Sequence, residues 1–258
     1  MIMEQTAEQQ PDLLLNVPAG ALIKTTLVDF PGRVASTFFL KGCNVRCPYC
    51  YNTGLVLGGR AAEGDTLSTT EELFAHLEHR KNMLTGLVVS GGEPLINPLT
   101  PYIISRAKKL GYKVKLDTNG TLPEELELII SNTETHPDFI AMDIKTAPSR
   151  YASEICIKDS ALSHRDIPAL ISRSVSLIAQ YPSDCREWRT VLVPPLVKKD
   201  DIDAMAAILP ADASWQFAQF RNENCIDPAY NKIPPHIDAE LKELVSYAQK
   251  RIPGAALR

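Results

Sequence analysis

The sequence has no excess of basic residues. Its 258 residues include 27 Lys or Arg and 31 Asp or Glu, which gives a formal net charge of −4. A domain dedicated to nucleic acid usually has a strongly basic face, so this balance argues against that class of protein. We therefore expect no dedicated nucleic-acid binding.

Long apolar runs are also missing from the sequence. No segment approaches the ~20 apolar residues of a membrane-spanning helix, and residues 1–11 lack the basic and apolar regions of a signal peptide. These absences predict a cytoplasmic protein with no membrane partner, whose cysteines stay reduced and available to metal. Residues 1–20 are predicted to form a flexible tail, and residues 21–258 a single domain.

The main cysteine motif has no fourth member. Cys43, Cys47 and Cys50 form a C-x3-C-x2-C pattern within eight residues. A structural zinc site and a fully ligated [4Fe–4S] cluster each take four protein ligands. Three thiolates would leave one iron open to a ligand that reacts. Three structural cysteines, or a degraded zinc site, are the alternative explanation.

The remaining cysteines, Cys156, Cys185 and Cys225, form no C-x2-C pair. A second cluster is therefore not favoured. The simplest interpretation is that these residues are small buried apolar side chains.

Six segments have the apolar and β-branched character of strands: residues 34–40, 87–90, 113–117, 139–145, 189–193 and 215–220. Most are followed by a helical pattern or a long connection, and this alternation is typical of a parallel sheet. Right-handed crossovers would curve such a sheet, and six strands are fewer than the ~8 of a complete barrel. The sequence therefore predicts an α/β fold, a partial (β/α)6 TIM-type barrel that is open on one side.

Polar or glycine-rich residues follow four of these strands, and they include Cys43, Gly91-Gly92-Glu93, Asp117-Thr118-Asn119-Gly120 and the pair Asp143 and Lys145. Ligands bind at the carboxyl ends of strands in parallel α/β folds. We therefore expect these residues to form one site.

Together these motifs resemble the radical S-adenosylmethionine (SAM) superfamily, which has C-x3-C-x2-C with an aromatic residue, here Tyr49, before the last cysteine. The motif Gly91-Gly92-Glu93-Pro94 follows one strand later. Three further segments resemble the activating enzymes of glycyl radical enzymes, namely KTTLVDFPG at 24–32, DTNG at 117–120 and R-x-V-x-V-P at 189–194. The resemblance is closest to the activases of anaerobic ribonucleoside-triphosphate reductase and pyruvate formate-lyase. The chain departs from many activases at Tyr51, where they have histidine.

The resemblance implies that Cys43, Cys47 and Cys50 each bind one iron of a [4Fe–4S] cluster, and that SAM binds the fourth. One electron from the cluster would cleave SAM to methionine and a 5′-deoxyadenosyl radical that abstracts hydrogen. Residues implied to contact SAM are Tyr49, Gly91, Gly92, Glu93, Asp117, Asn119, Lys145 and Arg189. A monovalent cation, Na⁺ or K⁺, is implied at Asp117, Thr118 and Asp143. The alternatives are turn roles for Asp117 and Asp143, a solvated Lys145 and a structural ion pair at Arg189.

Three functions follow from this interpretation. In the first, the protein takes hydrogen from a glycine Cα of a partner glycyl radical enzyme, with flavodoxin or ferredoxin as reductant. In the second, it is a small radical SAM oxidoreductase that modifies a small molecule or nucleoside, resembling the carboxydeazaguanine synthases. In the third, it is an iron–sulfur electron carrier that is not an enzyme.

Overall fold

The computed structural model describes residues 15–57, 67–158 and 160–258. They group into two compact units. Most of the predicted tail, residues 1–14, lies outside the described residues. The described part of the tail is not all irregular, because the first strand, β1, begins at Pro18 rather than after residue 20.

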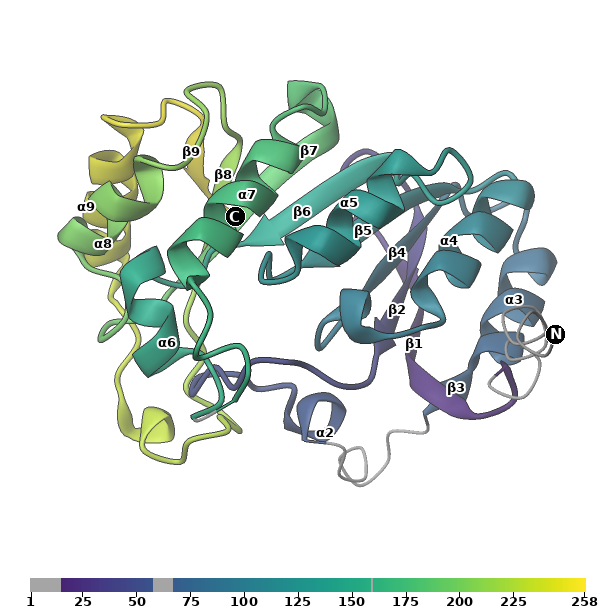
Figure 1. The fold of residues 1–258 in the computed structure, drawn as a ribbon, viewed down its shortest axis with the longest axis horizontal. Helices are drawn as coiled ribbons and strands as arrows, with labels where there is room; N and C mark the ends of the chain where they lie inside the picture. The colour runs from purple at the N-terminus through teal and green to yellow at the C-terminus, as the bar shows by residue number, and fades with distance from the viewer. Residues whose placement is uncertain (1–14, 58–66, 159) are drawn as a thin grey trace, which may run out of the picture. The chain divides into compact units, whose positions relative to one another are not determined.

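The first unit contains a sheet with the strand order β3-β1-β2-β4-β5 (Figure 1). Its strands are β1 (Pro18–Thr26), β2 (Ala35–Leu40), β3 (Ser68–Thr69), β4 (Gly86–Gly91) and β5 (Lys113–Thr118). β1 is antiparallel to β2 and β3, whereas β2, β4 and β5 are parallel. The interior of β4 is buried throughout, as expected for an apolar run in a parallel sheet.

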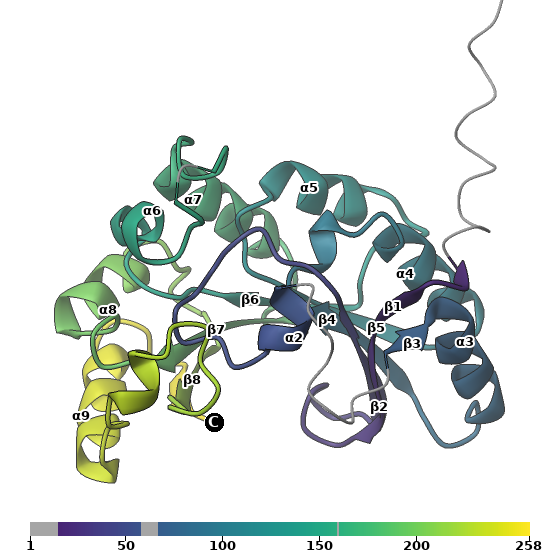
Figure 2. The ribbon, with the colours of Figure 1, turned by 90° about the horizontal axis from the view of Figure 1, so that it is seen from below.

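Two helices of the first unit, α3 (Thr70–His79) and α4 (Thr100–Lys109), lie side by side (Figures 1 and 2). α3 begins with a capping box, in which the Thr69 hydroxyl accepts the N–H of Glu72 and the Glu72 carboxylate accepts the N–H of Thr69. Shorter elements near this unit are α2 (Thr53–Val56) and the 3₁₀ turn η1 (Pro94–Ile96).

The second unit contains four neighbouring parallel strands: β6 (Phe139–Asp143), β7 (Arg186–Leu192), β8 (Trp215–Gln219) and β9 (Ala255–Leu257). Its helices are α6 (Tyr151–Glu154), α7 (Ile167–Ile178), α8 (Lys199–Ala206) and α9 (Asp238–Gln249). α8 and α9 lie side by side in both views (Figures 1 and 2). The short 3₁₀ turns are η2 (Pro148–Arg150), η3 (Ser183–Cys185) and η4 (Tyr230–Lys232), and α5 (Pro123–Ser131) runs from this unit into the first.

The core of the second unit is aromatic and includes the fully buried Trp188, Trp215 and Phe217. The Trp215 indole N–H donates to the Thr190 hydroxyl at 2.9 Å, which in turn donates to the Ile144 carbonyl at 2.7 Å. A buried polar group therefore keeps its hydrogen bonds, as the low dielectric of a core requires.

All six strands predicted from the sequence are present. β7 begins at Arg186, three residues before the predicted start at Arg189. The charged residues before the apolar run gave no strand pattern in the sequence, yet Arg186 and Trp188 are buried in the structure. β9 has three residues, too few to give a pattern in the sequence. Among the described helices, none is long and apolar enough to cross a membrane.

Candidate active site

The three cysteines of the motif lie on a loop in the second unit, residues 43–50, which we call the cysteine loop. The Arg46 N–H donates to the Ile155 carbonyl at 2.8 Å, and Val45 forms an isolated antiparallel bridge with Cys156. The end of α6 therefore supports the loop. Cys156, predicted to be a buried apolar side chain, is partly exposed instead and belongs to that support.

Asn119 connects the end of β5 to the cysteine loop. Its Nδ2 donates to Oδ1 of Asn44 at 2.9 Å and lies 3.9 Å from Sγ of Cys43. The Asn44 amide donates to the Thr121 hydroxyl at 2.8 Å, and Oδ1 of Asn119 accepts the Thr121 N–H at 3.0 Å. The sequence predicted Asn119 as a cofactor contact, and the structure gives it a position beside a predicted cluster ligand, where hydrogen bonds to sulfur tune a cluster.

The ends of β5 and β6 and the middle of β7 bring four charged side chains together. Nε of Arg189 lies 2.7 Å from Oδ1 of Asp143, and Nη1 of Arg189 lies 3.1 Å from Oδ2 of Asp117. Nζ of Lys145 lies 3.4 Å from the other oxygen of Asp143. Arg189 and Lys145 keep only 20% and 14% of their side chains exposed, so the alternative of a solvated Lys145 is contradicted.

This arrangement favours the charged forms of Lys145, Arg189 and Asp143. Burial opposes the charge on Lys145 and Arg189, but the neighbouring carboxylates raise the pKa of both bases well above the usual values. Burial also opposes the charge on Asp143, yet Arg189 and Lys145 hold its pKa below the ordinary value. The result is a partly buried cluster of two bases and two acids joined by ion pairs.

Burial favours the protonated form of two thiols of the cysteine loop, Cys47 and Cys50. Burial raises the pKa of Cys47 to about 12, although Lys145 acts in the opposite direction. Burial also raises the pKa of Cys50. Because metal ligands must be thiolates, binding of a cluster here would release protons from these side chains.

Two tyrosines border the charged cluster. Tyr49 is buried, and burial raises its pKa well above the usual value. The hydroxyl of the fully buried Tyr151 accepts the N–H of Lys145 at 2.8 Å. Tyr51, by contrast, is 56% exposed. The sequence motif identified Tyr49, whereas nothing in the sequence pointed to Tyr151, whose contact depends on the turn after β6.

In the first unit, Gly91 and Gly92 at the end of β4 let the main chain lie close to β2. Gly91 has φ of +134°, and a Cβ on it would collide with the backbone oxygen of Leu40. The Gly92 N–H donates to that same oxygen at 3.0 Å. Only a residue without Cβ fits at position 91, which explains this part of the motif.

Glu93 follows these glycines and is fully buried. Its N–H donates to the Gly42 carbonyl at 2.9 Å, directly before Cys43 in the chain. Oε1 of Glu93 accepts the N–H of Leu95 at 3.1 Å and so caps η1. The predicted contact of Glu93 with the SAM ammonium stays a prediction.

The donor chemistry fits an iron–sulfur cluster, because the cysteine loop offers three cysteine thiols. In the described part of the chain, however, no group of three His, Cys, Asp or Glu side chains is arranged to hold a metal ion, so the loop supplies donors without a ready-made ligand geometry. For the monovalent cation, Asp117 and Asp143 are bridged by the Arg189 guanidinium. Cation binding by these residues and Thr118 stays a prediction.

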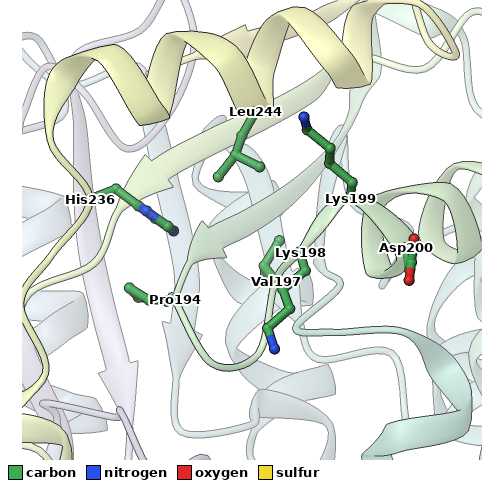
Figure 3. Close-up of a pocket in the computed structure, with 7 residues that line it drawn as sticks. All are labelled: Pro194, Val197, Lys198, Lys199, Asp200, His236 and Leu244. Carbon is green, nitrogen blue, oxygen red and sulfur yellow. The ribbon is translucent and has the colours of Figure 1, made fainter.

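A cavity of about 360 Å³ lies elsewhere in the second unit (Figure 3). It is lined by Pro194, Val197, Lys198, Lys199, Asp200, His236 and Leu244. None of these is a predicted site residue. We therefore place the candidate site at the cysteine loop and the charged cluster.

Comparison with known proteins agrees with this location. Residues 37–165 match the family model described as the radical SAM superfamily. The match includes the cysteine loop, both glycines and the charged residues of β5 and β6, and it covers half of the chain. The chain belongs to the radical SAM superfamily and is a radical SAM enzyme.

Individual relatives differ in how much of the chain they match. A protein of Methanocaldococcus jannaschii named "Putative glycyl-radical enzyme activating enzyme" is 29% identical over 93% of this chain and 95% of its own length. The 7-carboxy-7-deazaguanine synthase of Aquifex aeolicus is 36% identical, but over 34% of this chain and 37% of its own. A structure of TYW1 with a lysine-pyruvate adduct has a TM-score of 0.56 at 12% identity, covering 84% of this chain and 74% of that one. That likeness concerns the fold alone, and it confirms the partial-barrel class predicted from the sequence.

Proposed function

We propose that this radical SAM enzyme activates a glycyl radical enzyme by abstracting hydrogen from a glycine Cα of that partner. The observation that carries the proposal is the likeness to a glycyl-radical enzyme activating protein along 93% of the chain. At this coverage the likeness must include β7 and β8, which lie beyond the segment that the superfamily model matches. The resemblance to carboxydeazaguanine synthase covers only about a third of the chain.

The residues of the site have separate roles in this proposal. Cys43, Cys47 and Cys50 hold the cluster as thiolates. When bound, a reduced [4Fe–4S] cluster supplies one electron to SAM, whose cleavage gives the radical that abstracts hydrogen. Lys145 and Arg189 offer partly buried positive charge to the SAM carboxylate, because charge-assisted hydrogen bonds are strong where water is scarce.

Asp143 orients both bases. Its carboxylate contacts Nε of Arg189 at 2.7 Å and Nζ of Lys145 at 3.4 Å, so both cations are held before the ligand arrives. A pre-positioned site loses less side-chain entropy on binding. Flavodoxin or ferredoxin is the proposed reductant.

The proposal is tested with anaerobically reconstituted protein, dithionite, SAM and each glycyl radical enzyme encoded in the same genome. A glycyl radical doublet in the electron paramagnetic resonance spectrum is expected with one of them. Deuterium transfer into 5′-deoxyadenosine from a partner labelled at its glycine Cα should accompany the signal. Cys50→Ser should abolish both signals, while Cys185→Ser, a cysteine outside the site, should retain them.

SAM cleavage without any doublet would reject the activase and leave the superfamily assignment intact. Deuterium transfer from a purine-related small molecule instead of the protein would favour the carboxydeazaguanine-synthase-like alternative. Failure of the reduced, reconstituted protein to cleave SAM would favour the electron-carrier hypothesis.

A further inference from the structure

The segment between β8 and α9, residues 220–237, folds back on itself, and we call it the strap. At its base, Nε2 of Gln219 donates to the His236 carbonyl at 2.6 Å, so the two ends of the strap lie together. Compact loops whose ends meet in this way are often functional.

The strap contacts the cysteine loop through two main-chain hydrogen bonds. The Ile226 N–H donates to the Cys50 carbonyl at 3.0 Å, and the Asp227 N–H donates to the Pro48 carbonyl at 3.0 Å. Both acceptors flank Tyr49, so the strap fixes the loop on either side of the buried aromatic residue. The two segments lie beside each other in both views (Figures 1 and 2).

The shape of the strap depends on one side chain. Oδ1 of Asn231 accepts the Cys225 N–H at 2.9 Å, directly before the residue that bonds to Cys50. The Asn231 carbonyl also accepts from the Asn222 side chain at 3.3 Å. Cys225 is buried, and its thiol contacts the Arg221 carbonyl at 3.7 Å.

These contacts form a continuous connection from Asn231 through Cys225 and Ile226 to Cys50. Asn231 itself is exposed, so it adds little to the core and its replacement should not unfold the protein. Its hydrogen bond instead sets the direction of the next two N–H groups. The residue before Cys225, Asn224, has φ of +54°. This backbone conformation needs support from its surroundings, and the hydrogen bond between Asn231 and Cys225 lies next to it.

We propose that Asn231 is a positioning residue for the cysteine loop, acting through the strap on the Pro48 and Cys50 carbonyls. By holding these carbonyls, the strap keeps the Cys50 thiol in place and limits the access of solvent to the metal that it binds. The inference rests on the proposed function, since it assumes a cluster on this loop. It assigns a structural role to a segment outside the residues that the superfamily model matches.

The test compares four forms of the full-length reconstituted protein: wild type, Asn231→Ala, Asn231→Asp and Asn132→Ala. Asn132 is a matched control, because its Oδ1 likewise accepts a nearby N–H, that of Glu134 at 2.9 Å, in the first unit. The measurement is the rate at which an iron chelator removes the cluster's visible absorbance under anaerobic conditions. Hydrogen exchange of the peptide that contains Ile226 and Asp227 is measured by mass spectrometry on the same samples.

Loss of one net hydrogen bond should increase the open fraction of the strap about five-fold. Asn231→Ala should therefore release iron about five-fold faster and exchange the 226 and 227 amides faster, at an unchanged melting temperature. Asn231→Asp, which keeps the acceptor oxygen, should behave like wild type, as should Asn132→Ala. Equal iron release from Asn231→Ala and Asn132→Ala would overturn the inference.

The two hypotheses fail in different ways. If the wild type binds no cluster after reconstitution, the proposed function fails, and the exchange measurement alone decides whether Asn231 orders the strap. If Asn231→Ala changes exchange but not iron release, the strap is ordered by Asn231 without positioning the metal ligands, and the inference is wrong.

Discussion

Replacing Arg189 by Met should leave two carboxylates without enough positive charge. Arg189 contacts both Asp117 and Asp143, and Lys145 alone remains to compensate them. Removing one partner of a fully buried ion pair costs about 3–5 kcal/mol. Because a third of the Asp143 side chain is exposed, solvent screens part of this effect. We expect about 2–3 kcal/mol, or a melting temperature lower by about 5–10 °C for a protein of this size.

The pH dependence gives a second criterion for the same variant. In the wild type, the Asp143 pKa lies below the ordinary value of 3.8, so its contribution to stability is present above that pH and is lost as the pH falls through the folded pKa. Without Arg189, the remaining positive charge no longer outweighs the effect of burial on the two carboxylates. The pKa of the pair should then be higher in the folded state than in the unfolded state. That penalty is largest at neutral pH and disappears on acidification.

The assay is thermal unfolding of the cluster-free, reduced protein at about pH 7 and at about pH 4.5, followed by circular dichroism. The difference between wild type and Arg189→Met should shrink at the lower pH. Arg173→Met is the matched control, since Arg173 also contacts two acids, Glu124 and Glu127, but is 47% exposed. It should cost less than about 1 kcal/mol. A pH-independent difference, or equal effects of the two variants, would refute the electrostatic reasoning.

Three shorter predictions follow from other contacts. Gly91→Ala should lower the free energy of unfolding by about 3 kcal/mol, because the new Cβ meets the Leu40 backbone. Gly111→Ala, also at positive φ but with nothing within 4 Å, should lower it by about 1 kcal/mol. Equal losses in urea unfolding would contradict this. Thr190→Val should lower stability by about 1–3 kcal/mol in thermal unfolding, since the buried Trp215 N–H and the Ile144 carbonyl lose their partner, and a neutral result would show that both groups find another. Asn119→Ala should give the bound cluster a different reduction potential in redox titration from Asn119→Ser, because serine can still donate towards Cys43. Identical potentials would show that the 3.9 Å contact has no influence.

The local part of the site could be predicted because it depends on spacing along the chain. Cys43, Cys47 and Cys50 predict a metal-binding loop by their separation alone, and Asp117 and Asp143 lie near the carboxyl ends of predicted strands. Gly91 could likewise be recognised, since only glycine suits its backbone conformation. These features depend on residues that are close together in the sequence, so they can be recognised without the tertiary structure.

Contacts between distant segments could not be predicted in the same way. The sequence left open whether Arg189 forms a structural ion pair or binds a ligand. Its pairing with Asp117 and Asp143 depends on how β5, β6 and β7 are placed next to one another. Tyr151 and Cys156 gave no signal, because their value to the site depends on the path of the chain after β6.

The sequence by itself thus determined the superfamily and six of the strands, and it predicted the three cysteine ligands. The reason is that spacing, periodicity and glycine conformations are local properties of the chain. Only the tertiary structure decided that Arg189 neutralises two acids, that Asn119 lies beside Cys43 and that the strap holds the carbonyls of Pro48 and Cys50. Those contacts join segments far apart in the sequence, and hydrogen bonds and ion pairs act over a few ångströms in space, whatever the separation along the chain.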